Sequence, residues 1–393
     1  MTGSRLISNT MPEHGQPLTE TESQIAGKAG PARVRVMLGA FPDYAPTPLV
    51  DLPDSASRFR VGAVMLKDES GRYGLGSFKA LGGAYAVARL LQAQLSDQLG
   101  RMVAPEELLT PEIRALAARI TVCCATDGNH GRSVARGASL FGCRCVIYLH
   151  AGVSTGREAA IAQFGAEMRR VPGNYDDSVA EARRVAEAEG WLLVSDFSSE
   201  GYEEIPGLVM QGYTIMMDEI LAEAPAPFTH VFVQAGVGGL AGVVCGYFHD
   251  VLGASRPRTI VVEPDLAPCL QASAAAGRLV SVPAGAPTVM AMLECYEPSL
   301  AAWRIVAKSA DDFLLISDAE AVAGLRRLAG EKAGDRGLVI GESGASGYAA
   351  LQVAADDPDL RARLGLDRTS RVLLIGTEGA TDPEVYQALL GQA

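Results

Sequence analysis

Apolar residues along this chain recur with two different periods, and the two alternate. Short apolar runs rich in β-branched residues predict strands, while longer segments with apolar residues at every third or fourth position predict helices. The predicted strands cover 61–66, 120–124, 144–149, 167–171, 192–195, 230–234, 259–263, 313–316 and 372–375, and the predicted helices cover 79–95, 130–141, 157–164, 175–189 and 203–222. An α/β fold is therefore expected.

The order of these elements predicts two domains. Residues 120–195 contain three consecutive strand–helix units, which favour a parallel sheet with right-handed crossovers. The later strands, together with strand 61–66, are expected to form a second parallel sheet in a larger domain that the first one interrupts. The predicted bounds are 1–30 for a polar, disordered tail, 31–90 and 203–393 for the large domain, and 91–202 for the small one.

Composition narrows the class of ligand. The 393 residues are 48% hydrophobic and carry a net charge of -12, from 46 acidic and 34 basic residues. An acidic chain is a poor partner for nucleic acids and anionic membranes, so small molecules are the expected ligands. The first 30 residues contain no apolar segment of the length that an export signal or a membrane span requires, and a cytoplasmic protein is expected.

The seven cysteines do not form a metal-binding pattern. They are scattered through predicted strands and lack the C-x-x-C spacing of metal sites. Cys143 and Cys145 alternate with apolar residues as side chains do along a strand, which does not favour a pair of metal ligands. We expect free buried thiols and no metal.

Lys79 is the first candidate for covalent chemistry. It closes the turn Gly76-Ser77-Phe78 and opens a helix that begins with small and apolar residues. A lysine in such surroundings is suited to bond with the aldehyde of a carbonyl cofactor. The alternative is a solvated surface charge, which is the usual state of a lysine at the start of a helix.

A glycine-rich loop at 236–239 lies between a predicted strand and a helix. Its backbone amides and the helix dipole are suited to bind a phosphate. The loop also reads Gly-x-Gly-x-x-Ala, and Glu263 ends a later strand about where a ribose-binding acid would lie, so a nicotinamide oxidoreductase is an alternative. Against it, a strand–helix block and the lysine segment precede the loop, and Gly239 adds a glycine that the dinucleotide fingerprint does not need.

A third segment, Thr126-Asp127-Gly128-Asn129-His130-Gly131, also follows a predicted strand. Its amides are suited to hold a carboxylate, Asn129 to donate to a phenolate oxygen, and Asp127 to accept a proton. An ordinary Asx–Gly turn with helix capping is the alternative. The glycine loop and this segment both lie at the carboxyl end of a predicted strand, where open parallel sheets bind their ligands.

Together with Gly341-Glu342-Ser343-Gly344-Ala345, these segments resemble the fold type II pyridoxal phosphate enzymes, which include serine and threonine dehydratases and the β-subunit of tryptophan synthase. Further segments narrow the resemblance to the diaminopropionate ammonia-lyase family. They are Tyr44-Ala45-Pro46-Thr47-Pro48-Leu49, Lys67-Asp68-Glu69-Ser70, Gly201-Tyr202, Met210-Gln211-Gly212-Tyr213 and Thr377-Glu378-Gly379. The likeness runs in order from about residue 40 to 386.

The resemblance implies a role for each matching residue. Lys79 would bind pyridoxal phosphate covalently, Asn129 would contact its ring oxygen, and Thr377 would lie near its pyridine nitrogen. The remaining cofactor contacts would be Gly236, Val237, Gly238 and Gly239 for the phosphate, and Glu342. Because Thr377 is neutral, it would not hold the ring nitrogen protonated, which suits elimination better than transamination. The resemblance also implies a homodimer.

Two acids separate this sequence from the dehydratases. Asp127 stands where those enzymes typically carry a serine, and Asp196 ends the last predicted strand of the small domain. Two carboxylates favour a substrate with an ammonium on its β-carbon, so α,β-elimination of 2,3-diaminopropionate to pyruvate and two ammonia is expected. The resemblance implies that both stereoisomers react, with Lys79 as the base for the L-isomer and Asp127 for the D-isomer. A helix cap or strand-end acid is the alternative for Asp196.

Two alternatives of the same fold remain open. A serine or threonine dehydratase shares almost every segment and differs at Asp127 and Asp196. A non-catalytic binding protein is the other, although it has no reason to retain Lys79. In the segment 288–298, Met292 and Tyr296 are bulkier than the residues that the family predicts, so substrate size or rate could differ.

Overall fold

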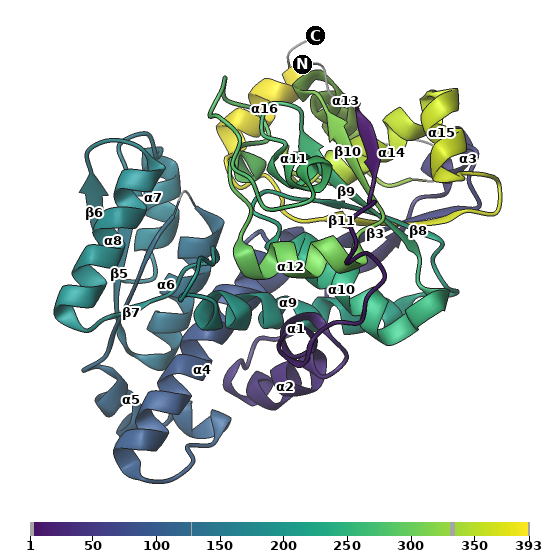
Figure 1. Cartoon of the computed structure of the whole chain (residues 1–393). Helices are drawn as coiled ribbons and strands as arrows, with labels where there is room; N and C mark the ends of the chain where they lie inside the picture. Colours follow the sequence, from purple (N-terminus) through teal and green to yellow (C-terminus); the bar gives the residue numbers. More distant parts are fainter. Residues whose placement is uncertain (1–3, 127, 331–334, 392–393) are drawn as a thin grey trace. The chain divides into compact units, whose positions relative to one another are not determined.

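The computed structural model describes residues 4–126, 128–330 and 335–391, which form two compact units. The first unit lies within Met1–Lys28, Pro46–Gly71 and Met216–Ala393, and the second unit comprises Ala29–Ala45 and Arg72–Ile215. Each unit is an α/β structure built on its own sheet (Figure 1). The predicted α/β fold with two parallel-sheet domains is therefore confirmed.

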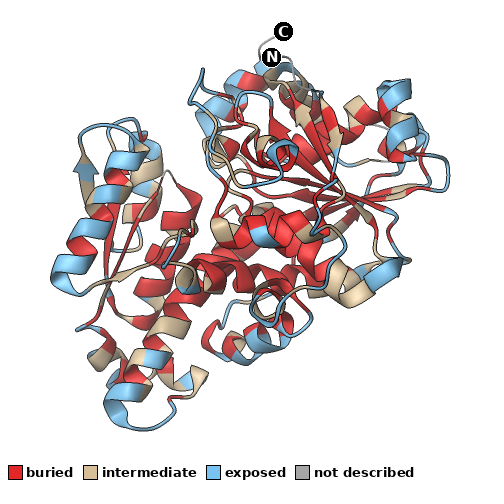
Figure 2. Ribbon diagram, viewed as in Figure 1, coloured by how far each residue is buried: buried red, intermediate tan, exposed pale blue. Residues whose placement is uncertain are grey.

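A seven-stranded sheet forms the centre of the first unit. Its strands are β1 (Leu6–Ser8), β2 (Leu49–Asp51), β3 (Ala63–Asp68), β8 (His230–Gln234), β9 (Arg258–Pro264), β10 (Asp312–Ile316) and β11 (Arg371–Gly376). They follow the order β1-β10-β9-β8-β11-β3-β2, with five parallel strands between two short antiparallel edges. The central strands are almost continuously buried (Figure 2), as a parallel sheet covered on both faces requires.

Helices cover this sheet. They are α1 (Glu20–Ala26), α3 (Pro53–Phe59), α10 (Gly239–Leu252), α11 (Cys269–Ala276), α12 (Leu300–Ser309), α13 (Asp318–Ala329), α14 (Ser346–Asp356), α15 (Pro358–Leu364) and α16 (Pro383–Gly391). α10 packs against α12 and α1, and α14 packs against α13 and the strands β8 and β10. The two helices that follow the candidate cofactor segments, α10 and α14, are thus held by neighbours within the same unit.

The second unit contains a smaller, entirely parallel sheet. Its strands are β4 (Thr121–Ala125), β5 (Arg144–His150), β6 (Glu167–Val171) and β7 (Leu192–Leu193), in the order β6-β5-β4-β7. Its helices are α2 (Gly30–Met37), α4 (Lys79–Leu99), α5 (Pro111–Ala117), α6 (Asn129–Phe141), α7 (Thr155–Ala162) and α8 (Tyr175–Glu189), and α9 (Glu204–Glu223) continues from this unit into the first. The predicted lysine helix is α4, which begins at Lys79.

The unit boundaries differ from the predicted domain bounds at α4. We expected residues 31–90 in the larger domain, but α4 packs against α6 of the second unit. A Cβ at Gly83 would lie 2.8 Å from Oγ of Ser133, and a Cβ at Gly137 would lie 2.9 Å from Cα of Ala84. The two glycines therefore let the helices approach closely, and this helix contact decides the unit to which α4 belongs.

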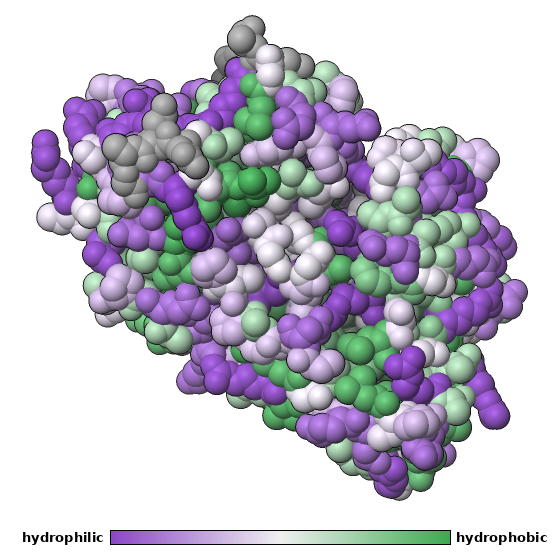
Figure 3. All heavy atoms as spheres, turned by 180° about the vertical axis from the view of Figure 1, so that it is seen from behind, coloured by the Kyte–Doolittle hydropathy of each residue, from purple (hydrophilic) through white to green (hydrophobic). Residues whose placement is uncertain are grey.

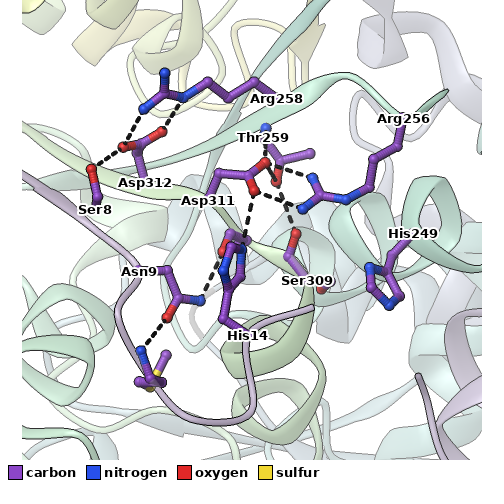
Figure 4. A network of polar contacts seen from close by, with 12 residues as sticks. Ser8, Asn9, His14, His249, Arg256, Arg258, Thr259, Ser309, Asp311 and Asp312 are labelled. Carbon is purple, nitrogen blue, oxygen red and sulfur yellow. Dashed lines mark hydrogen bonds and ion pairs between the residues drawn. The ribbon is translucent and has the colours of Figure 1, made fainter. Parts of the chain in front are cut away.

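The N-terminal segment also differs from the disordered tail expected for residues 1–30. Leu6–Ser8 pairs with β10 as the antiparallel edge strand β1. The segment then stays on the first unit through polar contacts (Figure 4): Ser8 donates to Asp312 at 2.7 Å, and His14 lies 3.1 Å from Asp311. Leu6 and Met11 of this segment are buried. These contacts are long-range and largely polar, so the hydrophobic periodicity of the segment does not predict them.

The surface mixes hydrophilic and hydrophobic residues on the face shown in Figure 3. Among the described residues, no helix has both the length and the apolar character needed to cross a membrane. Six of the seven cysteines are buried, and no disulfide joins any of them in the described part of the chain.

Candidate active site

The second unit holds Lys79 and Asp196 in direct contact. Nζ of Lys79 donates to Oδ2 of Asp196 at 2.5 Å, and the two side chains are 24% and 17% exposed. Burial alone would raise the pKa of Asp196, but the positive charge of Lys79 and the hydrogen bond from Lys79 hold that pKa well below its usual range. The sequence predicted a role for each residue separately, and the structure brings the two together around one ionised carboxylate.

His130 lies beside this pair, and the sequence analysis gave it no role. Its Nε2 lies 2.8 Å from the backbone oxygen of Val194, and because a carbonyl can only accept, Nε2 carries the hydrogen. Its Nδ1 lies 3.9 Å from Oδ2 of Asp196 and has no hydrogen-bond partner among the described residues. Burial lowers the pKa of His130, so the ring is neutral at pH 7 and presents a lone pair toward Asp196. The buried polar position in the Gly-Asn-His segment was the available signal.

The segment that begins α6 is capped by Thr126. Its Oγ1 accepts from the amides of Gly128 at 3.1 Å and Gly131 at 3.0 Å. Asn129 is the first residue of α6 and is 7% exposed. Helix capping, which was the alternative reading of this segment, is therefore present, and Thr126 provides it. Asp127 lies outside the described residues.

The start of α4 is fixed by α6. Oγ of Ser133 accepts from the amide of Ala84 at 2.9 Å and donates to the carbonyl of Ala80 at 3.3 Å. On the other side, a Cβ at Gly82 would lie 2.6 Å from the backbone oxygen of Val209 in α9. The first turns of α4 therefore pack between α6 and α9. This packing fixes the direction in which the Lys79 side chain leaves the helix.

In the first unit, the glycine loop after β8 has the geometry of an anion cradle. Gly238 has a φ of 98°, which a residue with a side chain rarely adopts, and α10 begins directly after it without a side-chain cap. A Cβ at Gly236 would lie 2.9 Å from Sγ of Cys295 and 3.2 Å from the oxygen of Met292. The described hydrogen bonds give no acceptor to the amides of 236–241, so these amides remain available to a phosphate.

Thr377 follows β11, the neighbour of β8 in the sheet. It is 4% exposed, and its Oγ1 lies 3.0 Å from Nε2 of Gln234, the last residue of β8. Parallel pairing of the two strands brings these residues together although they are distant in sequence. The sequence predicted Thr377 as a cofactor contact but gave Gln234 no role. A glutamine directly after the three apolar residues 231–233 of β8 was the signal.

Glu342 lies just before α14 and is 4% exposed. The neighbouring residues pack against the segment that contains Thr377, because the amide of Gly341 donates to the oxygen of Glu378 at 2.9 Å. Ser343 accepts from the amide of Met292 at 3.1 Å. The first unit therefore holds the 341–345 segment and the Thr377 segment in contact.

The two bulky residues noted in the sequence are held by contacts of their own. The amide of Met292 donates to Ser343, as described, and the hydroxyl of Tyr296 donates to Oε1 of Glu294 at 2.9 Å. Burial is the main cause that raises the pKa of Tyr296, and its hydrogen bond to Glu294 raises the pKa further.

Glu263 caps a helix instead of binding a ribose. Its carboxylate oxygens accept from the amides of Leu270 and Gln271, both at 2.7 Å, at the start of α11. The side chain is 1% exposed, and burial raises the pKa of Glu263 to about 8 although these hydrogen bonds lower it. Both carboxylate oxygens of Glu263 accept hydrogen bonds inside the protein. Glu263 therefore does not serve as the ribose-binding acid that a nicotinamide site requires.

Comparison with known proteins agrees with this arrangement. Residues 40–378 match the model of the family described as pyridoxal-phosphate dependent enzyme. The chain therefore belongs to this family of pyridoxal phosphate enzymes. The residues present fit the cofactor, because they supply a lysine amine, a glycine cradle that a Cβ would fill and a neutral buried hydroxyl. The nicotinamide oxidoreductase alternative is accordingly wrong.

Two relatives define the branch of the family. The diaminopropionate ammonia-lyase of Salmonella typhimurium is 40% identical over 360 residues, which span 89% of each chain. A crystal structure of the Escherichia coli diaminopropionate ammonia lyase with an aminoacrylate-PLP azomethine reaction intermediate aligns with a TM-score of 0.86 at 35% identity, over 98% of this chain and 96% of that one. These comparisons place the chain among the diaminopropionate ammonia-lyases.

The dehydratase alternative has a weaker match. A probable D-serine dehydratase of an Acidovorax species is 28% identical over 233 residues, which span 55% of this chain and 49% of that protein. This likeness is lower in identity and shorter than the match to the ammonia-lyases.

The buried acid Glu263 makes a pH-dependent contribution to stability. In an unfolded chain a glutamic acid titrates near about 4.3, so between about pH 5 and pH 8 the folded protein binds more protons at Glu263 than the unfolded chain does. Stability therefore falls as the pH rises through this window, by up to about 1.4 kcal/mol per pH unit. Glu263→Gln, which stays neutral, should remove this slope. Denaturant unfolding of both proteins across the window measures it.

The exposed Glu112 in α5 provides the control. Glu112→Gln should leave the slope of the wild-type protein unchanged. If the difference in unfolding free energy between Glu263→Gln and wild type were the same at about pH 5 and pH 8, the raised pKa of Glu263 would be refuted.

Proposed function

We propose that this chain is a pyridoxal phosphate-dependent lyase that converts 2,3-diaminopropionate to pyruvate and two ammonia by α,β-elimination. The observation that carries the proposal is the contact between Lys79 and the ionised Asp196 at 2.5 Å. A carboxylate that already holds one ammonium is suited to hold the β-ammonium of a diamino acid. The activity named for the relatives at 35% and 40% identity is the same.

The cofactor contacts follow those that the family resemblance implies. We assign the covalent link to Lys79, the contact with the ring oxygen to Asn129, and the contact with the ring nitrogen to Thr377. We assign the phosphate group to the backbone amides of 236–239, and Glu342 as a further contact of the cofactor. When bound, pyridoxal phosphate supplies the electron sink that makes the α-hydrogen of an amino acid acidic.

The side chains of the second unit move the protons. With the cofactor bound, the amine of Lys79 would remove the α-hydrogen of the L-isomer, and Asp127 would remove that of the D-isomer. The β-carbon–nitrogen bond then breaks and the β-amine leaves as ammonia. Hydrolysis of the released unsaturated amino acid gives pyruvate and the second ammonia. His130 is held by its hydrogen bond to the backbone oxygen of Val194, with Nδ1 3.9 Å from the Asp196 carboxylate.

Charge at Asp196 selects the substrate. An ion pair at 4 Å near a protein surface is worth about 4 kcal/mol, whereas the neutral hydroxyl of serine gains no comparable attraction. Because Asp196 is 17% exposed, the carboxylate is shielded enough from water for this difference to matter. The same acid thus explains why a diamino acid is favoured over serine.

Purified protein tests the proposal directly. It should be yellow, and added DL-2,3-diaminopropionate should release one pyruvate for every two ammonia, faster than serine releases pyruvate. Lys79→Ala should lose the visible absorbance of the covalently bound cofactor and the activity, while Lys28→Ala, at an exposed position, should keep both. A colourless wild-type protein, or an unchanged visible band in Lys79→Ala, would remove the central claim. Equal rates with serine would favour the dehydratase.

The two acids should separate by substrate isomer. Asp127→Asn should lose turnover of D-diaminopropionate and keep much of that of the L-isomer, because only one of the two bases is removed. Asp196→Asn should raise the KM for both isomers of diaminopropionate to the same extent. It should change the turnover of serine less. Steady-state assays with each pure isomer and with serine measure this. Turnover of D-diaminopropionate at the wild-type rate by Asp127→Asn would disprove the role of Asp127.

We further propose that the enzyme is a homodimer of the cytoplasm. Support comes from the family resemblance, from the seven cysteines without a disulfide in the described residues, and from the acidic, mixed surface. Sedimentation velocity of the purified holoenzyme should give the mass of two chains, and fractionated cells should hold it in the soluble fraction. A monomeric mass would refute the homodimer. Recovery from the exported fraction would refute the cytoplasmic location.

A further inference from the structure

Gln234 is a buried amide whose orientation is fixed by its neighbours. It ends β8 and is 1% exposed. Its Nε2 lies 2.8 Å from the backbone oxygen of Ile375 and 2.9 Å from that of Gly344. Both carbonyls can only accept hydrogen bonds, so the nitrogen of the amide, and not its oxygen, has to face them.

This orientation decides what the hydroxyl of Thr377 can do. Oγ1 of Thr377 lies 3.0 Å from the same Nε2, whose two hydrogens are shared among the two carbonyls and this hydroxyl. An amide nitrogen has no lone pair with which to accept a hydrogen bond. Thr377 is therefore the acceptor in this contact, and its hydrogen has to point away from Gln234. The hydroxyl is left as a donor toward whatever lies on its other side.

The other end of the amide shows that Gln234 is poorly suited to a purely structural role. Its Oε1 is buried without a hydrogen-bond partner among the described residues. Gly347 faces it, and a Cβ at that position would lie 3.2 Å from Oε1. A buried carbonyl oxygen without a donor costs free energy, which an apolar side chain of the same size would not.

We propose that Gln234 is a positioning residue that fixes the Thr377 hydroxyl as a hydrogen-bond donor to the pyridine nitrogen of the cofactor. The inference rests on the proposed function, which assigns Thr377 to that nitrogen. A nitrogen that accepts a hydrogen bond uses its lone pair and stays unprotonated. Gln234 thereby sets the protonation state of the cofactor ring without touching it, and with it the preference for elimination over transamination.

The test compares four proteins: wild type, Gln234→Leu, Thr377→Val and the double variant. Each apoprotein is titrated with pyridoxal phosphate, and the bound cofactor, labelled with nitrogen-15 in its ring, is observed by NMR. Each single variant should weaken cofactor binding roughly two- to tenfold, the effect of one lost neutral hydrogen bond, and both should shift the ring-nitrogen resonance. The double variant should match Thr377→Val, because Gln234 acts only through the hydroxyl.

Gln271 offers a matched control. It is a buried glutamine of the first unit whose Nε2 also donates to two backbone oxygens, those of Arg5 and Phe313, both at 3.1 Å. Gln271→Leu should leave the ring-nitrogen resonance at its wild-type position even where it lowers stability. Should Gln234→Leu fail to fold, Gln234→Met, with an unbranched side chain of similar length, takes its place.

The outcomes separate this inference from the proposed function. A wild-type resonance in the folded Gln234 variant, or a further shift in the double variant beyond Thr377→Val, overturns the role of Gln234 and leaves the lyase intact. A wild-type protein that binds no pyridoxal phosphate overturns the proposed function and the inference with it. A shift in Thr377→Val that Gln234→Leu reproduces supports both.

Discussion

Parallel pairing of strands is the constraint on which the rest of this structure depends. In a parallel sheet every strand ends at the same edge, so residues that follow neighbouring strands meet there however far apart they are in sequence. Pairing of β8 with β11 brings Gln234 to Thr377, and pairing of β4 with β7 brings the start of α6 to Asp196. Each unit thereby assembles its own set of polar groups.

Much of this could be predicted from the sequence because the relevant signals are local. Periodicity located the strands β3 to β11 and the helices α4, α6, α7, α8 and α9, but not the edge strands β1 and β2. The glycines of 236–239 and the lysine at the start of α4 mark their chemistry by their position. Three features could not be predicted: the contact of Gln234 with Thr377, the ring nitrogen of His130 that carries the hydrogen, and the ordered N-terminal segment. Each depends on contacts across the sheet or between helices, which a local pattern does not encode.

Two buried acids show how far the environment decides the chemistry of identical groups. Asp196 and Glu263 are both carboxyls that burial drives toward the neutral form. Asp196 has the ammonium of Lys79 beside it and stays charged, whereas the partners of Glu263 are two backbone amides and the thiol of Cys269, and its pKa rises. A nearby cation therefore makes one acid a candidate for substrate binding, and its absence leaves the other as a helix cap.

The short strand β1 has a consequence beyond anchoring the N-terminal segment. Without it, β10 would be an outermost strand with its row of backbone amides and carbonyls open, next to buried residues such as Phe313 and Leu314. Such an edge is a template on which another molecule can add a strand. By occupying that edge with a polar-flanked strand of three residues, the chain closes one side of its sheet against self-association.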